Sequence, residues 1–135
     1  MDQPDFETLA AFRNSLRRFL KFSEASAEAA GVSSQSYQAL LAIKGLDGGR
    51  KMTIGELAQV LLIRHNSAVG LADRLVAQGY LKRQLDPHDR RRVFLLLTPS
   101  GESLVTSIAT RNLAKLIELR GDLESVLKSL RSFGE

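Results

Sequence analysis

The sequence contains no cysteine among its 135 residues. Without cysteine, the chain can form no disulfide, thiolate metal site, cysteine nucleophile or thiol redox switch. No stretch approaches the roughly 18 consecutive apolar residues that a membrane-spanning helix needs. The opening residues, MDQPDFETLAAF, also lack the basic segment and apolar run of a signal peptide. These absences predict a soluble, cytoplasmic protein with no membrane partner.

The composition is that of an ordinary globular domain with an excess of positive charge. Apolar residues make up 44% of the chain and charged residues 25%, and the formal net charge is +4, with a pI near 9.8. This length fits a single domain with a modest core. The charge makes an anionic partner the first to test, although many basic proteins bind no nucleic acid.

The first helix predicted from the sequence has an unusual aromatic content. Four of the six phenylalanines lie between Phe6 and Phe22, and Gly31 is expected to end the helix. Apolar residues recur there at intervals of three and four; they are Phe6, Leu9, Phe12, Leu16, Phe19 and Leu20. This face packs either on its own domain or against a partner subunit, and the pattern alone does not separate the two.

The middle of the chain predicts a helix-turn-helix. After a helix between Ser33 and Gly45, the capping box TIGE at 53–56 begins a short helix that runs through Leu61. A further helix follows from near His65 to Gln78 and is closed by glycine. Its expected inward face consists of Ala68, Leu71, Ala72 and Leu75. Two short helices joined by a tight turn are common in helical proteins, so this signal is weak by itself.

A β-hairpin is predicted directly after these helices. Residues 80–85 and 92–97 are β-prone runs on either side of the turn DPHD. A helix-turn-helix followed by a hairpin is a winged helix. The second run, VFLLL, is apolar on both faces, so one face must meet more than a single helix, or a ligand. Thr98-Pro99 then begins another helix, which is expected to bury Leu104, Val105, Ile108, Leu113, Leu116 and Ile117. Gly121 is expected to break this helix before a last helix from Leu123 to Phe133.

Two stretches carry a family resemblance. LAQVLLIRHNSAVGLADRLVAQGYLKR, followed by DPHDRRRVFLLLTPSG, resembles the MarR family of transcription regulators. The marks are D-R-L-x-x-x-G at 73–79, the wing with aspartate and arginines, and L-T-x-x-G at 97–101. The six-helix layout extends the resemblance over nearly the whole chain. It implies a mainly α fold with a small β-hairpin, in which a winged helix-turn-helix DNA-binding region is joined to N- and C-terminal dimerisation helices.

The resemblance also implies how the chain is organised. Residues 1–135 form one MarR-like domain, with dimerisation helices at 1–31 and 99–135, a winged helix-turn-helix at 33–98 and a wing at 80–97. The protein is expected to be a homodimeric regulator, most consistent with a repressor, that binds a pseudo-palindromic operator in double-stranded DNA. The resemblance allows a small anionic or aromatic effector, which nothing in the sequence identifies. The implied dimer interface contains Phe6, Leu9, Phe12, Leu16, Leu123, Val126, Leu127 and Leu130.

The helix beginning near His65 is expected to enter the major groove. Asn66 can bond to adenine and Val69 can touch a thymine methyl group, while Gly70 permits close approach of the backbone. Asp73 and Arg74 either face DNA or form ion pairs with the wing, and His65 is either a phosphate ligand or a solvent-facing residue. The complete expected contact set is Arg64, His65, Asn66, Ser67, Val69, Gly70, Asp73 and Arg74.

Three residues depart from the family pattern, and one of them is Gly70, where many relatives carry a larger polar residue. Many relatives carry serine at the position of Arg64, so the cap of the recognition helix must come from elsewhere, such as Asn66. Leu62 replaces a common glycine in the turn, which leaves the angle between the two helices open.

Basic residues are concentrated in the wing. Five lie within the eleven residues 82–92. By resemblance, Asp89 braces Arg91, and the arginines at the tip reach into the minor groove, where a narrow A·T-rich groove concentrates negative potential. The alternative is a solvated charge run. The expected wing contacts are Lys82, Arg83, Asp89, Arg90, Arg91 and Arg92.

Other functions find less support in the sequence. With two histidines, no glycine-rich phosphate loop and no HExxH spacing, no enzyme activity, metal or cofactor is expected. A metal site from His65, His88, Asp86 and Asp89 can be drawn, but DNA contact explains both histidine segments better. A winged helix used only for protein–protein contact would carry a neutral or apolar wing tip. Membrane-surface binding by the first helix explains its phenylalanines less well than dimer packing does.

Overall fold

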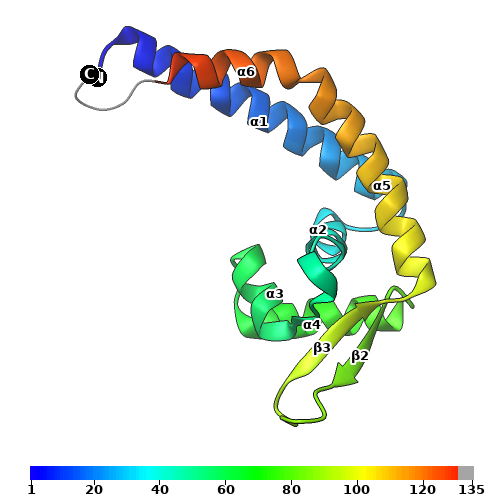
Figure 1. Cartoon of the computed structure of the whole chain (residues 1–135). Helices are drawn as coiled ribbons and strands as arrows, with labels where there is room; N and C mark the ends of the chain where they lie inside the picture. The colour runs from blue at the N-terminus through cyan, green and yellow to red at the C-terminus, as the bar shows by residue number, and fades with distance from the viewer. Residues whose placement is uncertain (131–135) are drawn as a thin grey trace.

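The computed structural model describes residues 1–130, with the side chain of residue 47 excepted, so Phe133 lies outside the described residues. The elements are α1 (Gln3–Ala29), α2 (Ser34–Lys44), a 3₁₀ turn at Asp47–Gly49, β1 (Met52–Thr53), α3 (Ile54–Leu61), α4 (His65–Ala77), β2 (Leu81–Leu85), β3 (Val93–Leu97), α5 (Pro99–Glu118) and α6 (Arg120–Ser129). The long helix α1 lies beside α5 and α6 to form an arm, and α2, α3, α4 and the sheet form a lobe at one end of it (Figure 1). The predicted winged-helix fold is confirmed.

Local sequence signals explain where the helices begin. The Thr53 hydroxyl accepts a hydrogen bond from the Glu56 N–H, and a Glu56 carboxylate oxygen accepts one from the Thr53 N–H, at 3.1 and 3.3 Å. This is the capping box predicted from the sequence. Helix α5 begins with Thr98 as its cap and Pro99 at its first position, also as expected. Gly79, at φ +82°, ends α4 in the left-handed conformation that glycine adopts without steric cost.

The wing is part of a three-stranded antiparallel sheet rather than an isolated hairpin. Strand β1, which the sequence analysis missed, pairs with β3, and the strand order is β1-β3-β2. The central strand β3 contacts α2, α3 and α5. Its inward residue Leu95 is fully buried, whereas Phe94 and Leu96 on the other face are partly covered. The apolar character of VFLLL on both faces therefore follows from its central place in the sheet.

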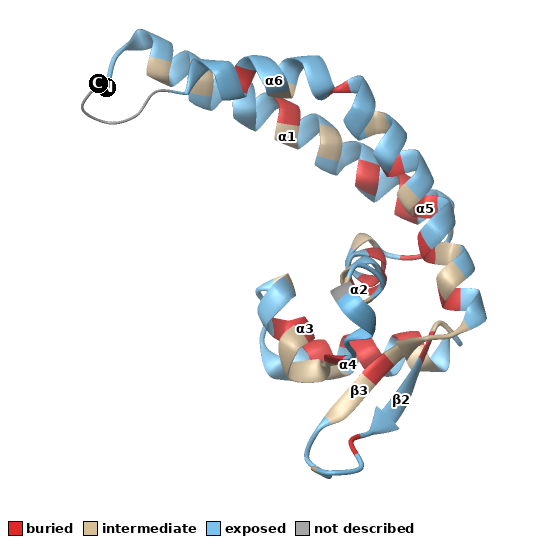
Figure 2. Cartoon of the chain, viewed as in Figure 1, coloured by how far each residue is buried: buried red, intermediate tan, exposed pale blue. Residues whose placement is uncertain are grey.

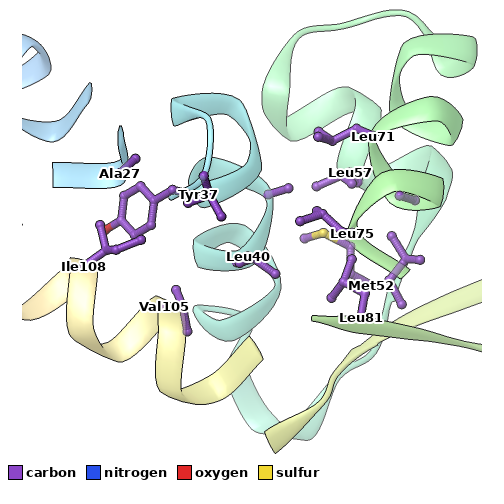
Figure 3. Close-up of a cluster of buried hydrophobic side chains, with 14 residues drawn as sticks. Ala27, Tyr37, Leu40, Met52, Leu57, Leu71, Leu75, Leu81, Val105 and Ile108 are labelled. Carbon is purple, nitrogen blue, oxygen red and sulfur yellow. The ribbon is translucent and has the colours of Figure 1, made fainter. Parts of the chain in front are cut away.

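The core lies inside the lobe and extends to the foot of the arm. Leu40, Leu57, Leu71 and Leu75 of the helices form one buried cluster with Met52, Leu81 and Leu95 of the sheet (Figure 3). Tyr37 extends from α2 towards Ile108 of α5, close to Ala27 of α1. Figure 2 shows that burial is concentrated in these regions, whereas much of the arm is exposed. One apolar cluster thus ties the lobe to the arm, so the position of the lobe depends on packing rather than on a linker.

The last two helices differ from expectation in two respects. The chain bends at the buried Leu119 and not at Gly121, which is the second residue of α6. The Leu119 N–H still donates to the Lys115 carbonyl and the Leu123 N–H to the Leu119 carbonyl, so the backbone kinks without leaving helical geometry. The sequence also predicted that α5 buries its whole apolar face, but its second half is exposed within the chain, at Leu113, Leu116 and Ile117.

Two of the family-like motifs meet in space at the start of α5. The Thr98 N–H donates to the Tyr80 carbonyl at 3.1 Å, and the Thr98 hydroxyl donates to the Gly79 carbonyl at 2.6 Å. These bonds hold the first turn of α5 against the end of α4. A Cβ atom at Gly101 would collide with the carbonyl oxygen of Tyr80. The glycine of L-T-x-x-G is therefore needed for close packing, since its backbone needs no left-handed conformation.

Replacing Gly101 by alanine should lower the free energy of unfolding by about 1–3 kcal/mol, because the methyl group forces two packed backbones apart. Urea denaturation followed by circular dichroism measures this change. Gly121→Ala is the matched control, since a Cβ there meets nothing within 4 Å. The control should stabilise its helix by up to about 1 kcal/mol. Equal midpoints for Gly101→Ala and the parent would contradict the close-packing explanation.

Candidate nucleic-acid interface

Helix α4 presents a polar outer face beside the sheet. Its inward residues Ala68, Leu71, Ala72 and Leu75 are all buried, as the sequence predicted. Most of the expected contact residues are exposed, and Val69 is half-buried. The exposed members are Arg64, His65, Asn66, Ser67, Gly70, Asp73 and Arg74. The lobe therefore offers most of this set to a partner, while Val69 can contribute only its outermost atoms.

The N-terminus of α4 carries no side-chain cap. Arg64 occupies the cap position, and no side chain there accepts a hydrogen bond from the first turn, so the expected capping role of Asn66 is wrong. The first N–H groups of a helix have no intrahelical acceptor and carry partial positive charge. An uncapped, exposed helix start of this kind can receive a phosphate oxygen, and the Asn66 side chain stays free for another contact.

The turn between α3 and α4 is closed by a leucine in an unfavourable conformation. Leu62 adopts φ +56°, and it is the single non-glycine residue with positive φ in the part of the chain that the structure describes. Its side chain is 91% exposed, so packing does not hold it there. The Ile63 N–H donates to the Ala58 carbonyl at 3.0 Å and keeps the turn tight. The chain thus keeps a glycine-like turn at a cost of about 1–2 kcal/mol.

An ion pair ties α4 to the wing. Asp73 of α4 accepts a hydrogen bond from the guanidinium of Arg83 on β2. The sequence left two roles open for Asp73, a contact with DNA or an ion pair with the wing, and the ion pair is present in the structure. Both side chains are about half exposed, so the pair contributes at most about 1 kcal/mol to stability. Its consequence is geometric, because it sets the position of the wing against the outer face of α4.

Arg74 has no such partner among the described side chains. It lines a shallow hollow on the outer side of α4 together with Gln35, Ile63, Ser67 and Gly70. A Cβ atom placed on Gly70 would meet nothing within 4 Å, so the hollow is open at this glycine. Sequence reasoning missed Gln35, because the start of α2 reaches the face of α4 only through the tertiary fold.

Two aspartates organise the wing tip. The Asp89 carboxylate accepts a hydrogen bond from the Arg91 N–H at 3.0 Å and lies 3.4 Å from Nε of the same residue. The expected contact between Asp89 and Arg91 is therefore present, with the Arg91 side chain 92% exposed. Asp86 is buried; its carboxylate accepts the His88 N–H at 2.8 Å and lies 3.8 Å from Nη1 of Arg92. The sequence assigned only the turn to Asp86, yet this residue also positions Arg92.

The residues predicted for the dimer interface divide by exposure. Phe6, Leu9, Phe12, Leu127 and Leu130 are exposed on the arm, and Leu16 and Leu123 are half-buried. Val126 is only 6% exposed because it packs within its own chain, so it does not fit the predicted role. The exposed apolar residues Leu113, Leu116 and Ile117 of α5, which the prediction assigned to the core, extend the apolar surface of the arm.

Two kinds of site are absent from the described residues. No group of three or more His, Asp or Glu side chains within the described part of the chain is arranged to hold a metal ion. The four residues considered for a metal site therefore do not form one there. Within residues 1–130, no helix is both long enough and apolar enough to cross a membrane.

Comparisons with known proteins agree with this geometry. Residues 30–92 match the sequence model of the MarR family. YcgE of Bacillus subtilis (strain 168), described as an uncharacterized HTH-type transcriptional regulator, is 35% identical over 94 residues, which are 69% of this chain. The match spans 59% of the length of YcgE.

Solved structures resemble the whole fold. AbsC, a MarR family transcriptional regulator from Streptomyces coelicolor, has a TM-score of 0.75 at 19% identity, over 97% of this chain and 92% of AbsC. A mutant of S. aureus MepR, bound to an oligodeoxyribonucleotide, has a TM-score of 0.65 at 20% identity, over 90% of this chain and 82% of that one. By its sequence, the segment of residues 30–92 belongs to the MarR family, and the fold of the chain resembles that of solved MarR family regulators.

Proposed function

We propose that the protein is a homodimeric transcription regulator that binds specific double-stranded DNA and acts as a repressor. The observation that carries the proposal is the combination of two features on one lobe. The uncapped start and polar outer face of α4 are fixed by an ion pair to a wing, and the tip of that wing holds Arg91 exposed beside Asp89. The related MepR structure contains bound DNA, which supports the same class of partner here.

The two features contact DNA in different ways. Helix α4 enters the major groove, where Asn66 reads adenine through its amide and Val69 touches a thymine methyl group. Arg64 and Ser67 hold phosphates at the start of the helix. Arg90 and Arg91 enter the neighbouring minor groove and respond to its width. Asp89 restricts the rotamers of Arg91 beforehand, so less side-chain entropy is lost on binding.

The exposed surface of the chain supports the dimer. A compact monomer of 14.9 kDa is expected to expose about 7,000 Å², whereas this chain exposes 9201 Å². The excess is of the size that an obligate subunit interface buries. Exposed apolar side chains on α1, α5 and α6 gather on the arm, where a second copy would cover them.

The dimer implies the form of the operator. Two-fold symmetry places the recognition helices about one DNA turn, roughly 34 Å, apart, and therefore requires a pseudo-palindromic site. By the family resemblance, we also propose that a small anionic or aromatic effector releases the protein from its operator. The residues that would bind such an effector are not assigned.

Selection of genomic DNA fragments by the purified protein tests the proposed function. We expect enrichment of fragments that share an inverted repeat with half-sites about one turn apart. Their affinity should fall steeply with salt, since several cations per subunit displace counterions. Recovery of random fragments, or of none, would contradict sequence-specific binding.

Replacing Gly70 by alanine should separate stability from DNA binding. The helix should gain about 1 kcal/mol, because alanine has the higher helix propensity and its methyl group meets no protein atom. Operator affinity should nevertheless fall about tenfold or more if the DNA backbone approaches this glycine. Thermal unfolding and fluorescence anisotropy measure the two effects. Unchanged affinity in the stabilised variant would exclude a contact at Gly70.

A further inference from the structure

The outward face of the sheet carries basic residues behind the wing tip. Strand residues alternate between the two faces of a sheet. Met52, Leu81 and Leu95 are buried on the inner face, so the residues between them along the strands lie together on the outward face. Gln84 pairs with Phe94, and Lys82 pairs with Leu96. By the same alternation, Lys51 and Thr53 lie on this outward face at the β1 edge. Residues from all three strands therefore share one exposed surface.

Lys51 is held flat across this surface. Its ammonium group donates to the Gln84 side-chain oxygen at 2.6 Å, which requires it to reach from the β1 edge over β3 to β2. It lies 5.8 Å from the centre of the Phe94 ring, and the Arg92 guanidinium lies 5.5 Å from the same centre. Two cations therefore share one aromatic ring. This arrangement keeps positive charge at a defined place on the sheet.

The charge on this face is only partly neutralised. Arg92 lies 3.8 Å from the carboxylate of Asp86, and Arg50 forms an ion pair with Glu56 at 3.2 Å. Lys51 and Lys82 form no ion pair with any carboxylate that the structure describes. The partners of Lys51 are a neutral amide and a ring, which restrict its motion without cancelling its charge. The two lysines thus leave an uncompensated positive surface.

We propose that Lys51 and Lys82 form a second phosphate-contacting surface, which grips the DNA backbone beside the minor groove that the wing tip enters. This surface is continuous with the wing tip, because the tip connects β2 to β3. Arg92 lies near both Asp86 of the tip and the Phe94 ring of the sheet. Its charge complements a phosphodiester backbone, and a lysine acts there as a point charge. The inference rests on the proposed function and extends the DNA footprint outward from the tip at each end of the operator.

The salt dependence of binding tests this inference. Each phosphate contact contributes about 0.9 to the slope of log K against log salt. In a dimer, the double variant Lys51→Gln/Lys82→Gln should therefore reduce the slope by about 3–4. Affinity at moderate salt should fall about tenfold or more, equally for operator and mismatched sites. The control Arg111→Gln removes one charge per subunit from an exposed position on α5, and it should leave the slope within about one of the parent. Lys51→Arg/Lys82→Arg should keep the parent slope.

The outcomes separate the inference from the proposed function. If the parent binds operator DNA and the double glutamine variant keeps the parent slope, the second surface does not exist, although the regulator function stands. If the parent binds no specific DNA, the proposed function itself fails. Ethylation interference on the parent complex provides a second readout, since ethylation of phosphates outside the wing-tip contacts should also prevent binding. Thermal unfolding shows whether the double glutamine variant has lost DNA affinity because its sheet is less stable. A parent-like salt slope in the double arginine variant would exclude that cause.

Discussion

Replacing Arg91 by alanine should weaken operator binding by about 30-fold to 10⁴-fold. An arginine that reads a groove is worth about 1–3 kcal/mol, and a dimer loses two of them, where each 1.4 kcal/mol corresponds to a factor of ten. The protein itself should be unaffected, because the side chain is 92% exposed and its pairing with Asp89 is weak. Fluorescence anisotropy with labelled operator DNA measures the loss.

The matched control for this variant is Arg111→Ala on α5. It removes the same charge and side chain from an exposed position outside the lobe. Its affinity should remain within a few-fold of the parent. An Arg91→Ala protein that shifts operator DNA as the parent does would show that the wing tip does not enter the groove. An equal loss in both variants would indicate a general charge effect.

Replacing Leu127 by aspartate should dissociate the proposed dimer. Leu127 is exposed on α6 within the apolar surface of the arm, and two-fold symmetry brings the substitution into the interface from both subunits. A carboxylate buried there without a partner costs about 3 kcal/mol or more, which raises the dimer dissociation constant at least about 100-fold. Sedimentation velocity should show a monomer, and operator affinity should fall because the two half-sites are bound independently.

Val60→Asp is the corresponding control for the dimer. Val60 is exposed to a similar degree, but it lies on α3, outside the arm. This variant should sediment as the parent does. A Leu127→Asp protein that remains dimeric would place the interface elsewhere than on α6. Monomeric behaviour of the parent itself would overturn the homodimer.

Local patterns in the sequence were sufficient for the helices and for the main surface of the lobe. Apolar spacing identified the buried face of α4, and therefore its exposed face as well. The caps at Thr53 and Thr98 were predictable because each acts within its own first turn. The family resemblance implied the contact between Asp89 and Arg91, which lie two residues apart. These features depend on neighbours in the chain, so the chain alone determined them.

Only the tertiary structure decided the features that join distant segments. Strand β1 is two residues long, too short to show alternation, and it exists because it pairs with β3. Asp73 forms an ion pair with Arg83 because the tertiary fold places β2 beside α4. Val126 of α6 is buried within the chain, while Leu113 on the preceding helix is exposed. An amphipathic pattern marks which residues are apolar, but the neighbour that covers them is set by how the helices pack.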